Sequence, residues 1–106
     1  MTADERIYGM LGLACRAGQL VSGEFEVERQ LQKGSVCAVL LDGGASENTR
    51  KRFSDACAYR ELPLFADFEP GRLGRAIGKD SRKVAALKKG KLSEQILSML
   101  RTQESV

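Results

Sequence analysis

Residues 36–41 form an unbroken apolar run, Val-Cys-Ala-Val-Leu-Leu, in a chain of 106 residues. Gly34 precedes the run, and Asp42-Gly43-Gly44 ends it. A run of this length is typical of a strand, and the absence of polar alternation indicates that both of its faces are buried. Such a strand belongs in a sheet that helices cover on both sides.

Helix and strand patterns alternate along the whole chain. Helical apolar spacing with capping residues predicts helices over 3–16, from after Ser22 to Gly34, from Ser46 to 60, from Glu69-Pro70 to Gly78, and from Ser93 onward. Thr2 and Glu5 have the spacing of a capping box. Short apolar segments predict strands over 19–21, 36–41, 62–66 and 84–87. We therefore expect a single α/β domain over residues 1–106, a three-layer α/β/α sandwich with a short mixed, largely parallel four-stranded sheet.

Composition argues against several classes of protein. No apolar stretch approaches the roughly 18 residues that span a membrane, and no signal-peptide core follows the N-terminus, so we expect a cytoplasmic protein. Three widely spaced cysteines argue against a disulfide framework and a Cys-x-x-Cys metal site, and are expected to be buried. Histidine, the commonest general base, is absent. We expect no metal, no cofactor and no catalytic residues.

The net charge is only +3, but it is unevenly distributed. Residues 1–68 hold 8 Lys+Arg and 10 Asp+Glu, a net charge of −2, whereas residues 69–101 hold 9 and 3, a net charge of +6. A basic C-terminal third suits a polyanionic partner, although scattered surface lysines give the same balance. The turn Lys88-Lys89-Gly90-Lys91 is interpreted as solvated surface rather than as a nucleic-acid contact.

Two chemical interpretations fail on spacing. Gly74 and Gly78-Lys79 are separated by three residues where a phosphate-binding P-loop needs four, and Asp80 stands where that loop needs Ser or Thr. The carboxylates of the second predicted helix have neither a partner base nor a metal-ligand pattern. They are typical of acidic residues in a first helical turn, where the helix dipole favours them.

The start of the second predicted helix is the candidate binding site. Ser22 and Gly23 are expected to form its cap and a tight start. The first N–H groups of a helix have no partner within it, so they are available to a phosphate or a base edge. Glu24, Glu26 and Arg29 flank this end.

These residues resemble the kink-turn-binding ribosomal L7Ae family and, within it, the small bacterial YlxQ-type branch. The resemblance covers about residues 5–88 and has two separate motifs. The first comprises Leu11-Gly12-Leu13-Ala14, Arg16-Ala17-Gly18, Leu20-Val21-Ser22-Gly23, Arg29, Lys33-Gly34, Val39-Leu40-Leu41 and Ala45-Ser46-Glu47-Asn48-Thr49, and the second is Leu73-Gly74-Arg75-Ala76-Ile77-Gly78-Lys79.

The resemblance implies a non-catalytic protein that binds sharply bent RNA such as a kink-turn. In the family's recognition motif Gly23 takes the glycine position, Glu26 the glutamate that reads guanine, and Arg29 the lysine that meets guanine or phosphate. Phe25 replaces an asparagine. Its ring either stacks on an unpaired base or packs into the core, and packing is the interpretation that we favour.

The family's second contact is the loop before the last strand. Here that loop is polar and basic, so Arg82 and Lys83 are expected to hold phosphates rather than pack on bases. The predicted RNA-binding set is therefore Ser22, Gly23, Glu24, Phe25, Glu26, Arg29, Arg82 and Lys83. The expected partner is structured RNA, with ribosomal RNA as a candidate, and ribosomal or translation-factor proteins are further candidates.

Two alternatives remain beside this hypothesis. A protein-interaction subunit of the translation machinery, with its RNA site weakened by Phe25, predicts an exposed apolar patch around the second helix. A fragment of an RNA ribose methyltransferase also resembles the pattern, because those enzymes carry a similar substrate-binding domain. We reject it because the chain ends before a catalytic domain.

Overall fold

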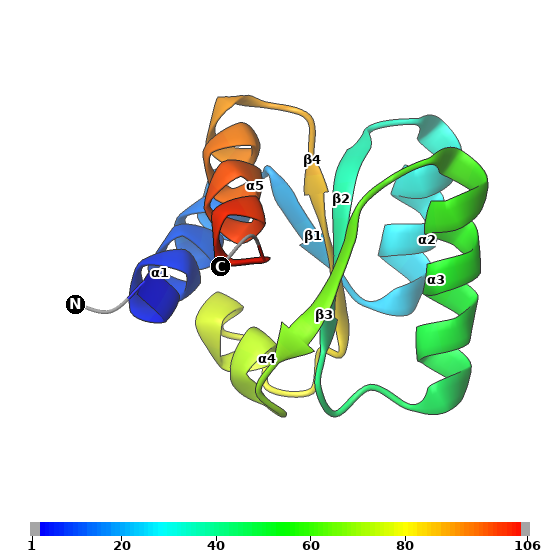
Figure 1. The fold of residues 1–106 in the computed structure, drawn as a ribbon, viewed down its shortest axis with the longest axis horizontal. Coiled ribbons are helices and arrows are strands. Elements are labelled where there is room, and N and C mark those ends of the chain that lie inside the picture. Colours follow the sequence, from blue (N-terminus) through cyan, green and yellow to red (C-terminus); the bar gives the residue numbers. More distant parts are fainter. Residues whose placement is uncertain (1–2, 105–106) are drawn as a thin grey trace.

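The computed structural model describes residues 3–104 and has helices on both faces of one sheet (Figure 1). The elements are α1 (Ala3–Arg16), β1 (Leu20–Ser22), α2 (Glu24–Lys33), β2 (Val36–Asp42), α3 (Glu47–Arg60), β3 (Leu64–Phe68), α4 (Arg72–Ile77), β4 (Val84–Lys88) and α5 (Lys91–Glu104). None of the helices in the described part of the chain is both long and apolar enough to cross a membrane.

The predicted three-layer sandwich is confirmed. Helices α1, α4 and α5 cover one face of the sheet, and α2 and α3 cover the other (Figure 1). Each face has its own apolar core, and alternate residues of β2 enter the two cores: Leu40 packs with Leu11 and Ile96, and Leu41 packs with Val27 and Phe53. The central strand is therefore buried on both faces, as its composition predicts.

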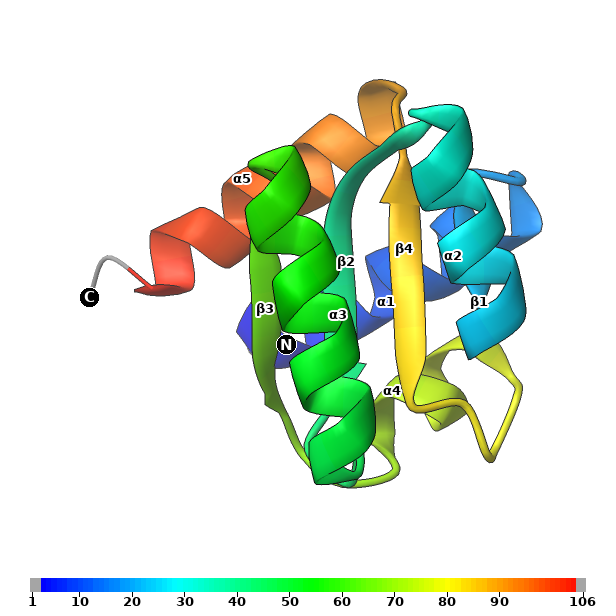
Figure 2. The ribbon, with the colours of Figure 1, turned by 90° about the vertical axis from the view of Figure 1, so that its right-hand side faces the viewer.

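The sheet is mixed, but the prediction that it is largely parallel is wrong. The strand order is β1-β4-β2-β3, and only the β2–β3 pair is parallel, whereas β4 runs antiparallel to both β1 and β2 (Figure 2). The cause is the six-residue helix α4, which is about 9 Å long at 1.5 Å per residue. It is too short to return the chain along the sheet, so β4 starts at the end where β3 stops.

A β-bulge shifts β3 relative to the prediction. Leu40 pairs with Phe65 and Asp42 with Phe68, so two residues of β3 face one residue of β2. The extra residue lets Phe65 and Phe68 both point into the same core, where each is buried. The strand therefore continues to Phe68 instead of ending at residue 66.

Some predicted helix ends are confirmed. The Ser46 hydroxyl caps α3 by accepting the Thr49 N–H at 3.1 Å. Gly34 and Gly78 end α2 and α4 in the left-handed conformation, with φ of 73° and 75°. Thr2 of the predicted capping box lies outside the described residues.

Three predicted helix starts are wrong, because the residues expected to begin these helices lie in a strand, inside the helix or before it. Ser22 lies in β1, where it pairs with Ala85, and does not cap α2. Ser93 is buried inside the first turn of α5, and its N–H donates to Gln19 Oε1 at 3.3 Å. Pro70 precedes α4, which starts at residue 72.

Candidate nucleic-acid interface

Gly23 joins β1 to α2 in a backbone conformation that suits only glycine. Its φ is 92° and its ψ is 146°, and its N–H donates to the carbonyl of Val84 at 2.9 Å. A Cβ atom at this position would lie 2.7 Å from Nη1 of Arg82. The glycine thus allows the guanidinium of Arg82 to lie directly against the start of α2.

The first turn of α2 is open. No side chain of the described residues caps it, so its N–H groups have neither an intrahelical nor a side-chain acceptor. A helix of 10 residues carries a partial positive charge at this end, which favours an anion. Together with Arg82, the open turn forms a small positive surface.

The three glutamates of α2 point in two directions, as their spacing predicts. Glu24 and Glu28 both face α3, where Arg52 bridges them: its Nη1 lies 3.0 Å from Glu24 Oε1, and its Nε and Nη2 contact the Glu28 carboxylate. Glu24 is therefore not free to contact a ligand without leaving Arg52.

Glu26 and Arg29 are paired with each other on the other side of the helix. The guanidinium donates through Nε to Oε2 at 3.1 Å and through Nη2 to Oε1 at 2.9 Å, and Gln30 Nε2 donates to Oε1 at 3.0 Å. These hydrogen bonds, from Arg29 first and then from Gln30, lower the pKa of Glu26 to about 2. The carboxylate is charged at any physiological pH.

The Glu26–Arg29 pair is absent from the sequence analysis, which assigns each of the two side chains its own contact with RNA. The pair lies at the surface, with side-chain exposures of 48% for Arg29 and 33% for Glu26. Exposed pairs of this kind contribute little to stability and exchange readily for other partners. Arg29 uses only two of its five N–H groups here, so the others still face solvent.

Phe25 is 80% exposed, which overturns the interpretation that its ring packs into the core. The buried residues of α2 are Val27, Gln30 and Leu31. Position 25 is two residues before Val27, which places it on the opposite side of a helix with 3.6 residues per turn. The spacing alone was sufficient to predict this exposure.

Lys83 lies beside Arg82 in the sequence, but its side chain is directed toward a different part of the protein. Its Nζ is 3.9 Å from Oδ2 of Asp42, at the end of β2. Asp42 is fully buried, and its carboxylate accepts the N–H groups of Gly44, Gly71 and Leu73 at 2.9, 2.9 and 3.2 Å. Among residues 3–104, Lys83 thus has an acidic partner that Arg82 lacks.

The buried Asp42 is a structural residue that the sequence analysis missed. Burial acts to raise the pKa of its carboxyl, but the three N–H donors and the charge of Lys83 outweigh burial and lower it. The carboxylate fastens the start of α4 to the end of β2. The sequence signal for this structural role was an acidic residue directly after the apolar run of residues 36–41.

The profile of the family described as "Ribosomal protein L7Ae/L30e/S12e/Gadd45 family" matches residues 5–97. The chain belongs to the L7Ae family. Its relatives include the "RNA-binding protein YlxQ" of Bacillus subtilis (strain 168), 37% identical over 88% of this chain and 93% of that protein. A protein of the same name from Enterococcus faecium is 33% identical over 71% of this chain and 73% of that one.

Solved structures with the same fold were found as well. A protein of unknown function from Bacillus halodurans is 35% identical and superimposes with a TM-score of 0.82, covering 90% of this chain and 96% of that one. The Giardia lamblia 15.5kD RNA binding protein superimposes with a TM-score of 0.76 over 97% of this chain and 88% of that one. At 16% identity, the second likeness concerns the fold alone.

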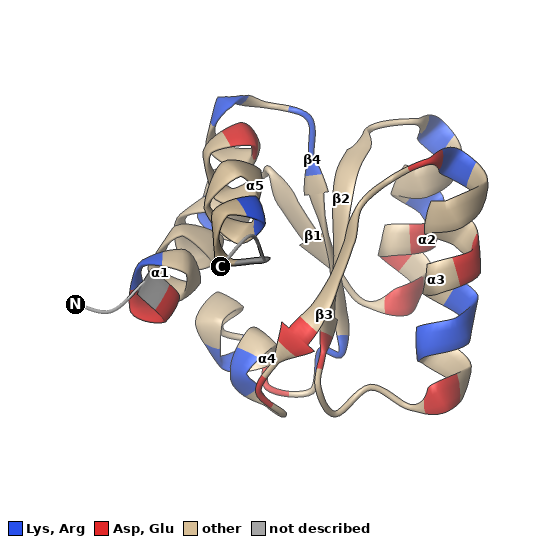
Figure 3. Ribbon diagram, in the orientation of Figure 1, with Lys and Arg blue, Asp and Glu red and all other residues tan. Residues whose placement is uncertain are grey.

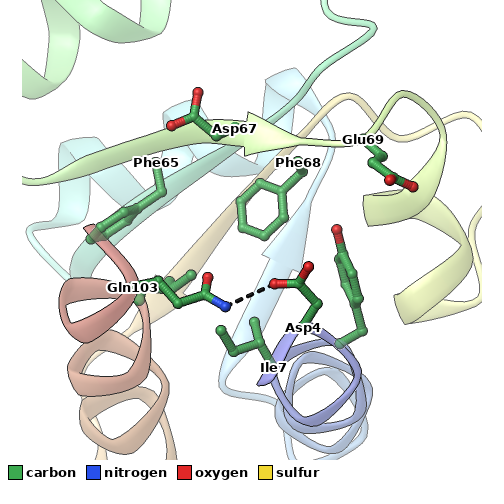
Figure 4. A pocket seen from close by; sticks show the side chains of 9 residues that line it. Asp4, Ile7, Phe65, Asp67, Phe68, Glu69 and Gln103 are labelled. Carbon is green, nitrogen blue, oxygen red and sulfur yellow. Dashed lines mark hydrogen bonds between the residues drawn. The ribbon is translucent and has the colours of Figure 1, made fainter. Parts of the chain in front are cut away.

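A cavity of about 270 Å³ lies away from the predicted site in this L7Ae-family chain, between α1, β3 and α5 (Figure 4). The rings of Tyr8 and Phe68 line it with centroids 6.0 Å apart, and Gln103 donates to Asp4 across one side at 2.8 Å. None of the eight predicted RNA-binding residues lines this cavity. Of those eight, the structure brings Gly23 and Arg82 into contact and directs Lys83 toward Asp42.

Proposed function

We propose that this member of the L7Ae family is a non-catalytic RNA-binding protein that recognises bent, structured RNA such as a kink-turn, in the cytoplasm. The relatives named RNA-binding protein YlxQ support RNA as the partner. The observation that carries the proposal is the junction at Gly23, where an open helix start, the guanidinium of Arg82 and the exposed ring of Phe25 occur together. Ribosomal RNA is the first candidate, because the family is named for ribosomal proteins.

Each group has a defined part in this interaction. The N–H groups of the first turn of α2 and the Arg82 guanidinium hold phosphates, which fixes the position of the RNA without reading its sequence. The ring of Phe25 stacks on an unpaired base, which a bend in the RNA exposes. A straight duplex presents phosphates but no such base, so it is bound more weakly.

Glu26 and Arg29 supply base recognition. A carboxylate accepts from amino groups on base edges, and a guanidinium donates to guanine O6 and N7. Their hydrogen bonds to each other keep both groups beside the start of α2, and because the pair is exposed these bonds are exchanged for bonds to the RNA.

A mobility-shift titration of a kink-turn RNA and a straight duplex of equal length, each at two salt concentrations, tests the proposal. We expect the bent RNA to bind more tightly and both affinities to fall as salt rises. Glu26→Ala should reduce discrimination between bent and straight RNA by about 1–3 kcal/mol, and Arg29→Ala should weaken binding to both. Equal affinity of the wild-type chain for the two RNAs would contradict bend recognition.

A second arm of this test separates the site from general charge. Lys51→Gln also removes a positive charge, but from the outer side of α3, where Lys51 pairs with Asp55 at 3.2 Å. It is expected to bind bent RNA like the wild type, whereas Arg82→Gln is expected to bind several-fold more weakly. Equal losses in both variants would place the interaction elsewhere.

The protein-interaction alternative gains no support from the surface. It predicts an apolar patch around α2, and Phe25 is the large hydrophobic residue exposed there. The two other large hydrophobic residues that are exposed in residues 3–104 are Leu13 on α1 and Tyr59 on α3. Since α1 lies in the opposite layer and Tyr59 at the far end of α3, these side chains form no continuous surface.

A further inference from the structure

We propose that the end of the sandwich farthest from Gly23 is a second RNA contact, which holds the phosphates of a duplex that flanks the bent RNA. This inference rests on the proposed function. The contact consists of Lys33, Lys88, Lys89 and Lys91, which we call the lysine end. The proposal gives the 88–91 turn a role in binding, where the sequence analysis interprets it as solvated surface.

Two segments that are far apart in the sequence meet at the lysine end. Lys33 is the last residue of α2, Lys88 is the last of β4, and Lys91 is the first of α5. The N–H of Lys89 donates to the carbonyl of Ser35 at 2.9 Å, and Lys88 is the register partner of Val36. In Figure 3 the β4–α5 turn and the end of α2 accordingly form two blue areas along the upper rim.

These lysines have no internal neutralising partner. Within residues 3–104, none of the four side chains forms an ion pair, and three of the four residues are exposed while Lys88 is half-buried. Lys51 and Lys83 differ from these four, because each faces an aspartate. Acidic groups near these lysines include Glu94, in the first turn of α5, and Glu26, which the Lys33 charge reaches, so four cations outnumber these two carboxylates.

A continuous face of α2 connects the two ends. Glu26, Arg29 and Lys33 follow each other at intervals of three and four residues, which places them on one side of the helix. The Lys33 charge reaches the carboxylate of Glu26, where it is one of the causes of the lowered pKa. The helix has 10 residues, so this face is about 15 Å long.

The chemistry of lysine selects phosphate rather than bases. Its ammonium is a mobile point charge without the planar fork that reads a guanine edge, so the contact is independent of sequence. A duplex that leaves the bend at the start of α2 and runs along this helix carries its phosphates past Arg29 and Lys33 to the β4–α5 turn. The lysine end therefore adds affinity only to RNA with a long enough flank.

The test compares two versions of one bent RNA, with a minimal flank and with a flank of about one helical turn, roughly 10 base pairs. The variant is Lys33→Gln with Lys89→Gln, and the matched control is Arg6→Gln with Lys51→Gln, two exposed cations on α1 and α3. Affinity is measured by mobility shift over a range of salt concentrations. The control removes the same charge from other surfaces.

We expect the lysine variant to bind the long-flank RNA several-fold more weakly, with a salt slope smaller by about 0.7–0.9 for each phosphate that the protein no longer neutralises. Its affinity for the minimal RNA and both affinities of the control should match the wild type. Wild-type binding of both RNAs with an unchanged slope in the lysine variant would overturn the lysine end alone. Failure of the wild-type chain to bind either RNA would overturn the proposed function and this inference together.

Discussion

Replacing Phe25 by alanine separates RNA binding from folding, because the ring is 80% exposed in the free protein. A phenylalanine offers about 200 Å² of surface, so folding buries only about 40 Å² here, worth roughly 1 kcal/mol at 25 cal/mol per Å². Alanine regains part of this through its higher helix propensity, about 0.5 kcal/mol. We therefore expect Phe25→Ala to leave the free energy of unfolding within about 1 kcal/mol of the wild type.

The effect on binding should be larger than the effect on stability. Stacking of a base on an aromatic side chain is worth about 1–3 kcal/mol, which corresponds to a loss of affinity from about 5-fold to about 150-fold. The assay is fluorescence anisotropy with a labelled kink-turn RNA at fixed salt. Urea unfolding of the same samples, followed by circular dichroism, measures their stability.

Tyr59→Ala is the matched control. Tyr59 is another aromatic residue on a helix and is 86% exposed, but it lies near the end of α3 instead of at the start of α2. We expect Tyr59→Ala to bind RNA like the wild type. If Phe25→Ala binds within twofold of the wild type, or if both variants lose affinity equally, the assignment of Phe25 as a stacking residue is refuted.

Four further predictions concern three residues that shape the site. Asp42→Ala removes the acceptor of three N–H groups, of which that of Leu73 is buried, so urea unfolding should show a loss of about 1–3 kcal/mol. Folding lowers the pKa of Asp42 below its usual 3.8. The stabilisation by this carboxylate is therefore complete above pH 3.8 and is lost as the pH falls through the folded-state pKa. We expect the free energy of unfolding of Asp42→Asn to depend less on pH than that of the wild type between pH 2 and 5. Gly23→Ala forces a residue with a side chain into a φ of 92° and displaces the guanidinium of Arg82. Thermal unfolding should show a loss of stability of about 1–3 kcal/mol, and a binding assay should show a lower affinity for RNA. Arg52→Ala releases Glu24 beside the open helix start, so we expect weaker RNA binding than that of the wild type, with a difference that shrinks as salt screens the carboxylate. A difference that does not change with salt would contradict this explanation.

The sequence was sufficient for the layers but not for the strand directions. The apolar run that ends at Leu41 and the helical spacing of Val27 and Leu31 are local signals, and these residues are buried where the signals place them. Strand direction depends on whether a connection is long enough to cross the sheet. The sequence predicted a helix from Glu69-Pro70 to Gly78, but only residues 72–77 are helical.

Helix starts were predicted well only where the capping group is local. Ser46 bonds a residue three positions away, so its pattern is visible in sequence. The N–H of Ser93 is bonded to the side chain of Gln19, and Ser22 is paired with Ala85. Such partners are distant in the sequence, and no local pattern contains them.

The sequence also located the candidate interface without its internal pairing. The positions of Gly23, Phe25 and Glu26 at the start of α2 follow from the motif, but the contact of Arg82 with Gly23 requires β4 to pair with β1. The Glu26–Arg29 pair could have been expected from spacing, since residues three apart on a helix are neighbours. The bridge from Arg52 to α2 could not, because it depends on how α3 packs.

The ion pairs explain how the N-terminus of a helix with three glutamates can bind an anion. Left unpaired, Glu24 and Glu26 in the first turn would compete with phosphate for the positive end of α2. Arg52 pairs with Glu24, and also with Glu28, from the side of α3, and Arg29 pairs with Glu26 within the helix. With both carboxylates paired, the open N–H groups and Arg82 dominate the local field, and anion binding there becomes consistent with an acidic sequence.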